Sequence, residues 1–244
     1  MSAAIRAHLD SPDEPLLSLS KLNGQDVSIA LGDYLYSKAF ELISGCGNLD
    51  ILSCISCATR LMCEGELIQV CERDNLDLLK ERYLLIVKKK TASLFAASCQ
   101  AGGMVSRCPS PLKNALKQYG LNFGIAFQIV DDCLDLISDK QKTGKEVGCD
   151  FKMGELTLPI LNLLSLDLIE RDKLTAFLKN HNDKKSFYQI RERFLNSEAI
   201  KKTRDDVFFY MRKAKSGLNM LNDSRFKDSL MNLADYIVER VKIA

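Results

Sequence analysis

The chain has 244 residues, 46% of them hydrophobic and 27% charged, which predicts a folded protein with a sizeable core rather than a disordered chain. Thirty-four Lys and Arg residues against 32 Asp and Glu residues leave a net charge of +2, which excludes a generally basic surface for nucleic acid or for an anionic membrane. No run reaches the roughly 18–20 apolar residues of a transmembrane segment, and the N-terminal stretch lacks the apolar region of a signal peptide. We therefore expect a cytoplasmic protein.

The nine cysteines also favour a reducing compartment, because their number is odd and nothing marks the chain for secretion. Cys54 and Cys57 form the only Cys-x-x-Cys pair. A zinc site needs about four ligands, and the chain offers no second pair and only two histidines, His8 and His181. A buried pair of thiols on a helix is therefore favoured over a metal or redox site.

The first half of the chain predicts long helices separated by few breaks. Residues 1–25 are polar, interrupted by Pro12 and Pro15, and form a divergent leader, whereas residues 26–244 form the helical domain. Helical spacing of apolar residues and capping residues predict one helix beginning near Asp26, another near Asn48, and a third running from Asn75 to Gly102-Gly103.

A fourth helix is predicted after Pro109-Ser110-Pro111, from about Leu112 to Ser138, and four or five shorter helices follow from about Leu158 to the C-terminus. No strand-like alternation persists, and there is no internal repeat. The predicted fold class is all-α, an antiparallel helical bundle.

Three carboxylates interrupt the fourth helix, whose other positions are mostly apolar. At about 100° per residue, Asp131 and Asp135 lie about 40° apart, and Asp132 lies beside them. Grouped carboxylates repel one another and are costly to bury, and a hard cation such as Mg²⁺ offsets that cost. A solvated acidic stripe is the alternative, which the Gly-Lys step that follows makes less attractive.

Several blocks occur in the order found in one enzyme family. The blocks are ALGDYLYSKAF (30–40), CEGELIQ (63–69), KTASLFAASCQAGG (90–103), AFQIVDDCLDLISD with TGKEVGCDF and GELTLPILNLL (126–164), and LADYIVER (233–240). Together they resemble the trans-type polyprenyl diphosphate synthases, over about residues 26–244. The resemblance implies an isoprenoid synthase bundle that condenses isopentenyl diphosphate with an allylic diphosphate.

The resemblance also implies roles for individual residues. Asp131, Asp132 and Asp135 would hold Mg²⁺ against the diphosphate, and Lys90 and Lys145 would contact its oxygens. Thr91 and Gln128 would be polar neighbours of the same group. Glu66 and Gln69 match the family's Gly-Glu-x-x-Gln, to which we assign a mainly structural role.

The sequence departs from the family at its N-terminal end. Counting back from Gly32-Asp33 places the family's first Asp-Asp-x-x-Asp within the first ten residues, which here read MSAAIRAHLD. By this count the first aspartate-rich motif, the arginine pair after it and the first helices of the bundle are missing. Glu155 stands where many relatives have lysine, which removes a further cation from a phosphate site.

Three hypotheses follow. The first is a prenyltransferase of isoprenoid biosynthesis, shortened and weak or inactive as an isolated chain. The second is a non-catalytic homologue that serves as partner subunit of a competent synthase, and the third is a helical interaction protein without a ligand. The carboxylates at Asp131, Asp132 and Asp135 argue against the third. Homo- or hetero-dimers are expected, partly from the family and partly because an incomplete bundle leaves apolar surface to cover.

Overall fold

The computed structural model describes residues 19–138, 147–166, 171–180 and 183–243, and every regular element in these ranges is helical. The predicted all-α fold class is therefore confirmed for the described residues. The chain divides into two compact units, residues 1–53 with 139–146, and residues 54–138 with 147–244. None of the described helices combines the length and the apolar character that crossing a bilayer requires.

The described part of the first unit contains α2 (Leu19–Gly45) and the beginning of α3 (Leu49–Cys71). Helix α2 begins seven residues before the predicted cap Asp26, so the helix extends into the segment predicted as a leader. The predicted cap of the next helix is correct, because the Asn48 side-chain oxygen accepts hydrogen bonds from the backbone N–H groups of Asp50 and Ile51, at 3.0 and 3.2 Å.

In the second unit, one continuous helical run contains α4 (Lys80–Val87), the π-helical turn η1 (Lys88–Ala92) and α5 (Ser93–Val105). The prediction that Gly102 and Gly103 end this helix is wrong by two residues, because α5 continues to Val105. Gly103 lies against Lys113 and Leu116 of the next helix, where an added Cβ would meet the Lys113 and Leu116 side chains at 3.2 Å. Gly103 therefore allows close packing of α5 against α6 and does not end the helix.

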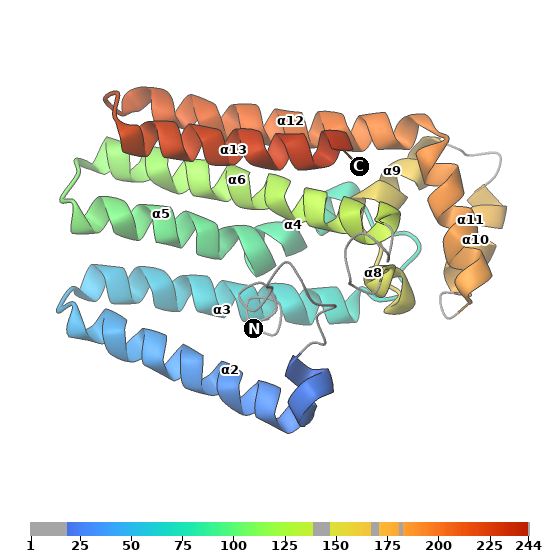
Figure 1. The fold of residues 1–244 in the computed structure, drawn as a ribbon, viewed down its shortest axis with the longest axis horizontal. Coiled ribbons are helices and arrows are strands. Elements are labelled where there is room, and N and C mark those ends of the chain that lie inside the picture. Colours follow the sequence, from blue (N-terminus) through green and yellow to red (C-terminus); the bar gives the residue numbers. More distant parts are fainter. Residues whose placement is uncertain (1–18, 139–146, 167–170, 181–182, 244) are drawn as a thin grey trace. The chain divides into compact units, whose positions relative to one another are not determined.

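Helix α6 (Ser110–Ile137) is the centre of the second unit and packs between α5 and α12 (Glu198–Gly217), as Figure 1 shows. Pro109 occupies its N-cap position and Pro111 its first turn, where a missing N–H costs nothing. Its buried face is apolar apart from Asp132, and Tyr119 donates a hydrogen bond of 2.7 Å from its hydroxyl to the backbone oxygen of Leu230.

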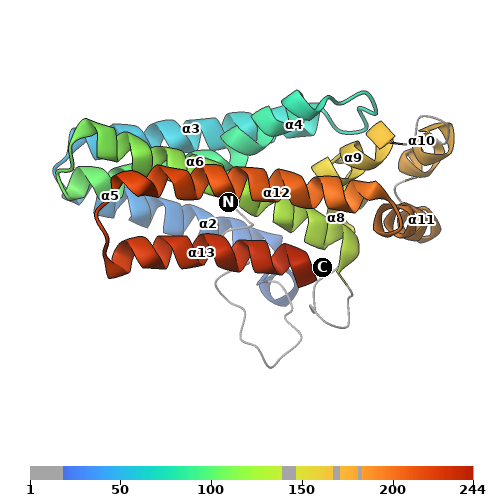
Figure 2. The same ribbon diagram turned by 90° about the horizontal axis from the view of Figure 1, so that it is seen from above.

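Several of the helices that follow α6 in the chain pack against it and complete the core of the second unit. The elements after α6 are the short α8 (Cys149–Lys152), α9 (Leu158–Leu166), α10 (Arg171–Lys179), α11 (Lys184–Leu195), α12, the 3₁₀ turn η2 (Leu218–Met220) and α13 (Arg225–Ile243). Figure 2 shows α13 running alongside α12, which it contacts. In the described residues from Leu158 onward, the α-helices α9 to α13 agree with the four or five helices that were predicted there.

Candidate functional site

A cavity of about 60 Å³ is lined by residues of α3, α4, η1, α6, α8 and the adjoining loops, and all of these lining residues belong to the second unit. Its apolar lining comes from Leu78, Ile86, Val87 and Leu156. Its polar lining is Gln69, Glu72, Tyr83, Lys90, Thr91, Gln128, Asp132, Asp150, Glu155 and Thr157. This cavity brings four of the predicted site residues together, namely Lys90, Thr91, Gln128 and Asp132.

The π-helical turn η1 directs two neighbouring side chains into the cavity. Lys90 and Thr91 both line it, although they are adjacent in the sequence. π-Turns within α-helices recur at functional sites. The turn is supported by Ser93, whose hydroxyl donates a hydrogen bond of 2.6 Å to the backbone oxygen of Lys89.

Gly65 allows α3 to approach this turn closely. A Cβ at Gly65 would lie 2.5 Å from the backbone nitrogen of Lys90, a contact that real structures do not tolerate. The close approach brings two side chains of α3, Glu66 and Gln69, within reach of Lys90. The Lys90 ammonium donates a hydrogen bond of 2.8 Å to the Gln69 side-chain oxygen and pairs with the Glu66 carboxylate at 2.8 Å.

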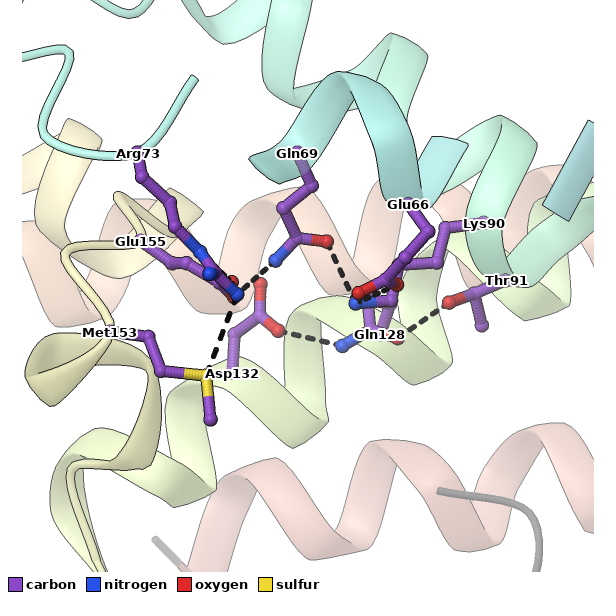
Figure 3. Close-up of polar contacts among 9 residues, drawn as sticks. All are labelled: Glu66, Gln69, Arg73, Lys90, Thr91, Gln128, Asp132, Met153 and Glu155. Carbon is purple, nitrogen blue, oxygen red and sulfur yellow. Dashed lines mark hydrogen bonds and ion pairs between the residues drawn. The ribbon is translucent and has the colours of Figure 1, made fainter. Parts of the chain in front are cut away.

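Asp132 is the one charged residue of α6 in the buried core, with 4% of its surface exposed. Its carboxylate accepts a hydrogen bond of 2.6 Å from the Tyr83 hydroxyl and one of 2.7 Å from the Gln128 side-chain nitrogen. The Gln128 side-chain oxygen in turn accepts from the Thr91 hydroxyl at 2.7 Å, as Figure 3 shows. All of these donors are neutral, so the Asp132 charge has no direct cationic partner among the described residues.

The other two aspartates of the predicted trio lie differently. Asp131 is exposed, whereas Asp135 is partly buried and accepts hydrogen bonds of 3.1 Å from the backbone N–H groups of Cys149 and Asp150. The Asp135 carboxylate thus holds the first turn of α8, and this places Asp150 near α6. We refer to Asp131, Asp132, Asp135 and Asp150 as the acidic cluster.

Burial and mutual repulsion raise the pKa values of three members of the acidic cluster, Asp132, Asp135 and Asp150. Burial, followed by the charges of Asp131 and Asp135, raises the pKa of Asp132 to about 7, against the opposing effect of the hydrogen bonds from Tyr83 and Gln128. Burial and the neighbouring carboxylates, Asp132 first, raise the pKa of Asp150 to about 9. The pKa of Asp135 is also raised, mainly by burial. A positive charge placed here would relieve this repulsion.

A second set of polar residues, which we call the mixed-charge network, consists of Glu66, Gln69, Arg73, Lys90 and Glu155. Glu155 is 7% exposed, and one of its oxygens accepts hydrogen bonds from Arg73 at 2.9 and 3.0 Å. Its other oxygen accepts from the side-chain nitrogen of Gln69 (Figure 3). Within this network each charged group has an oppositely charged partner.

The turn before Glu155 depends on Gly154, whose φ of +69° lies in the left-handed region that favours glycine. The Gly154 backbone oxygen accepts a hydrogen bond of 2.9 Å from the Asp74 backbone N–H. This contact joins the segment after α8 to the segment after α3. It therefore places Glu155 beside Gln69 and Arg73.

The acidic cluster has the donor chemistry that Mg²⁺ requires, since its ligands are carboxylate oxygens whose pKa values rise with their mutual repulsion. Among the described residues, however, no three acidic, Cys or His side chains converge on one point that could hold a metal. This fits an ion bound by one or two carboxylates, with water and phosphate oxygens in its other positions, as is common for Mg²⁺.

The outcome for the sequence-predicted residues is mixed. Lys145 lies outside the described residues, and Asp131 and Asp135 do not line the cavity. Cys54 and Cys57 are free thiols, Cys57 being exposed rather than buried as predicted.

The sequence analysis did not identify three residues that contribute to the site: Tyr83 and Asp150, which line the cavity, and Arg73, which pairs with Glu155. The only available signal was for Asp150, in the Gly-Cys-Asp step after the Gly-Lys.

The fold and the site define a class of protein: an all-helical isoprenoid synthase fold with a cavity between an aspartate-rich helix and a Lys-Thr step. Residues 17–193 match the family profile described as "Polyprenyl synthetase". The chain therefore belongs to the polyprenyl synthetase family.

Individual relatives agree with this assignment. The octaprenyl diphosphate synthase of Escherichia coli is 30% identical over 218 residues, which cover 89% of this chain and 68% of that protein. The short chain isoprenyl diphosphate synthase of Methanothermobacter thermautotrophicus is 32% identical over 227 residues, with the same coverage. A solved structure, the polyprenyl synthase of Caulobacter crescentus complexed with calcium and isoprenyl diphosphate, is 32% identical and superimposes with a TM-score of 0.86 over 91% of this chain and 68% of that one.

Proposed function

We propose that this protein binds prenyl diphosphates together with Mg²⁺ in the cavity between α3, η1 and α6. Its substrates on this proposal are an allylic diphosphate and isopentenyl diphosphate, the reactants of prenyl transfer. The observation that carries the proposal is geometric: the buried Asp132 carboxylate, which is hydrogen-bonded by the neutral groups of Tyr83 and Gln128, lines the same cavity as the Lys90-Thr91 step. A divalent cation stabilises the ionised form of a buried carboxylate, and the bound cation in turn attracts a diphosphate.

Each proposed site residue has a role consistent with its position. Asp131, Asp132 and Asp135 hold Mg²⁺, with Asp150 as a fourth acid close to them. When bound, the ion neutralises charge on the diphosphate and so favours its departure from the allylic carbon. The Lys90 ammonium contacts phosphate oxygens, as does Lys145, whereas Thr91 and Gln128 hold Asp132 in place. Leu78, Ile86, Val87 and Leu156 keep water from the reacting carbon.

We also propose that a polypeptide of these 244 residues turns over slowly or not at all when isolated. The sequence contains a single Asp-Asp-x-x-Asp, at Asp131–Asp135. The remaining described cations of the site are already engaged, Lys90 with Glu66 and Arg73 with Glu155. Loss of one well-placed electrostatic group typically costs about 10²–10³ in rate. The measurement is incorporation of labelled isopentenyl diphosphate onto an allylic primer with excess Mg²⁺, and turnover near 1 s⁻¹, common for enzymes, would contradict this part of the proposal.

A second candidate function, partner subunit of a competent synthase, is favoured by the surface of α2. This helix carries several large exposed apolar side chains, namely Val27, Ile29, Tyr34, Leu35 and Leu42. Exposed apolar side chains of this number offer surface that a partner subunit could cover. We propose that the protein forms homo- or hetero-dimers in the cytoplasm, where its nine free cysteines would stay reduced. Light scattering at micromolar concentration tests this, since a monomer would contradict the homodimer.

A further inference from the structure

Gln69 connects the ammonium of Lys90 to a buried carboxylate. The Gln69 side-chain oxygen accepts from Lys90, and its side-chain nitrogen donates to Glu155. Arg73 neutralises Glu155 through two hydrogen bonds to the carboxylate oxygen that Gln69 does not use. Figure 3 shows the contacts that lead from Glu155 through Gln69 to Lys90, with Arg73 beside Glu155.

The chemistry of the two neighbours allows only one orientation of the Gln69 amide. An ionised carboxylate only accepts hydrogen bonds and an ammonium only donates them. If the amide turned over, its NH₂ group would face the Lys90 ammonium and its oxygen would face Glu155, so both hydrogen bonds would be lost. The charge of Glu155 therefore holds the Gln69 oxygen toward Lys90.

We infer that Glu155 is a positioning residue that acts through Gln69 on Lys90, an inference that rests on the proposed function in assigning Lys90 to the phosphate ligand. An ammonium has three donors, of which Gln69 and Glu66 take two. The hydrogen bonds to Gln69 and Glu66 fix the rotation of the ammonium and so determine the direction of its third N–H group. Arg73 makes a carboxylate acceptable next to an anion site, because it cancels the Glu155 charge.

For the substitution of Glu155, this inference predicts a change in anion affinity opposite in sign to the change that simple electrostatics predicts. Removing a negative charge near a bound anion should tighten binding, whereas loss of the positioning hydrogen bonds should weaken it. We expect Glu155→Gln to weaken Mg²⁺-dependent binding of inorganic pyrophosphate about three- to tenfold by titration calorimetry, the scale of one hydrogen bond. In a Gln69→Leu background the same substitution should change binding less than about twofold on that scale.

Asp206→Asn is the matched control. Asp206 carries a partly buried carboxylate that pairs with Lys80 at 2.7 Å. It does not line the cavity, and its other hydrogen bond is to Asn162 rather than to Gln69 or Lys90. We expect this variant to bind pyrophosphate as well as the parent or slightly better. The double variant Arg73→Gln, Glu155→Gln leaves no unpaired charge to oppose folding and should show the same weakening as Glu155→Gln. Unchanged or tighter binding by Glu155→Gln, or equal weakening in the Gln69→Leu background, would overturn the inference.

A ligand-free readout separates this inference from the proposed function. In protein with ¹³C-labelled lysine, the Cε–Hε signal of Lys90, assigned with Lys90→Arg, should move in Glu155→Gln and in Gln69→Leu but not in Asp206→Asn. Parent protein that binds no pyrophosphate would refute the proposed function, and the Lys90 signal would still decide the positioning. A signal that stays in place in Glu155→Gln would overturn the positioning.

Discussion

The acidic cluster and the mixed-charge network are connected to two adjacent residues, Thr91 and Lys90, yet their charges are balanced in different ways. Hydrogen bonds connect Thr91 through Gln128 to Asp132, and every direct donor to the Asp132 carboxylate is neutral. Hydrogen bonds connect Lys90 through Gln69 to Glu155, whose charge is balanced by Arg73. The mixed-charge network is thus complete within the protein, whereas burial raises the pKa values of Asp132 and Asp150 above that of a surface aspartate.

This difference separates a structural use of buried charge from a functional one. A buried ion pair that is satisfied internally holds elements in place and costs the fold little when intact. A buried cluster of like charges lowers stability until an external cation binds, and proteins commonly accept such a cost at functional sites. The four experiments below test this separation, beginning with the largest expected effect.

The largest effect is expected when the acidic cluster loses two members. The double variant Asp131→Ala, Asp132→Ala should lower Mg²⁺-dependent pyrophosphate affinity at least about thirtyfold, roughly 2 kcal/mol, because a cation would then lack its principal ligands. Titration calorimetry with and without Mg²⁺ measures the change. The control is Asp172→Ala, Asp228→Ala, which removes the same charge from two exposed positions far from the cluster in sequence. Equal affinity in the two double variants would refute the metal site.

Removing the cation of the mixed-charge network should lower stability rather than ligand binding alone. Arg73→Met leaves Glu155 buried without an opposite charge, and we expect a loss of about 2 kcal/mol, below the range for fully buried pairs because Arg73 is 37% exposed. Urea unfolding measures it. Adding Glu155→Gln to Arg73→Met should recover most of the loss, and failure to recover would mean that the network is not a balanced pair.

The acidic cluster should show the opposite stability behaviour, with a defined pH dependence. The folded-state pKa of Asp132, about 7, lies above its ordinary value of 3.8, so the folded state binds more protons between these values. The resulting stability is fully present below pH 3.8 and is lost as pH rises through 7, and Asp150 extends the loss to about pH 9.

In EDTA, therefore, Asp132→Asn should be more stable than the parent at pH 8 by about 1 kcal/mol, or roughly 2–4 °C in melting temperature. The difference should shrink at pH 5, where Asp132 is protonated in the parent. Thermal unfolding monitored by circular dichroism at both pH values measures this. A variant less stable than the parent at pH 8 would show that the Asp132 charge stabilises the fold.

The smallest effect on pyrophosphate affinity is expected from a substitution at Thr91, which is adjacent to Lys90. Thr91→Val removes the hydrogen bond to Gln128 but keeps the shape of the side chain, so Gln128 becomes freer to turn away from Asp132. We expect a two- to threefold loss of pyrophosphate affinity, less than one full hydrogen bond. Ser98→Ala on α5 is the control. A loss as large as that of the double aspartate variant would mean that Thr91 contacts the ligand directly.

The helical fold could be predicted well because helices are local structures. Spacing of apolar residues, the cap at Asn48 and the prolines before α6 all act within a few residues, and the structure agrees with each of them. The errors at Asp26 and at Gly102-Gly103 share one cause. A residue type that often begins or ends a helix was given that role, although neighbouring packing decides whether the helix continues.

The site was predicted only in part, for a physical reason. The Lys90-Thr91 step and the aspartates on α6 lie in recognisable short motifs. Tyr83 and Arg73 reach the cavity only through tertiary packing, Tyr83 to Asp132 and Arg73 to Glu155, 49 and 82 residues away. No local pattern carries such information. The expectation that Glu155 only removes a cation was incomplete, because its pairing with Arg73 depends on a contact across the fold.

The π-helical turn at Lys88–Ala92 bears on how this chain tolerates insertions and deletions. Deleting one residue there would convert residues 80–105 into one regular α-helix and rotate α5 by about 100° relative to α4. Phe95, which packs against Phe123 and Phe127 of α6 at ring-centroid distances of 5.3 Å, would turn away from its neighbours. Surface loops absorb changes of length easily, whereas here the residue count itself sets the direction of an entire helix face.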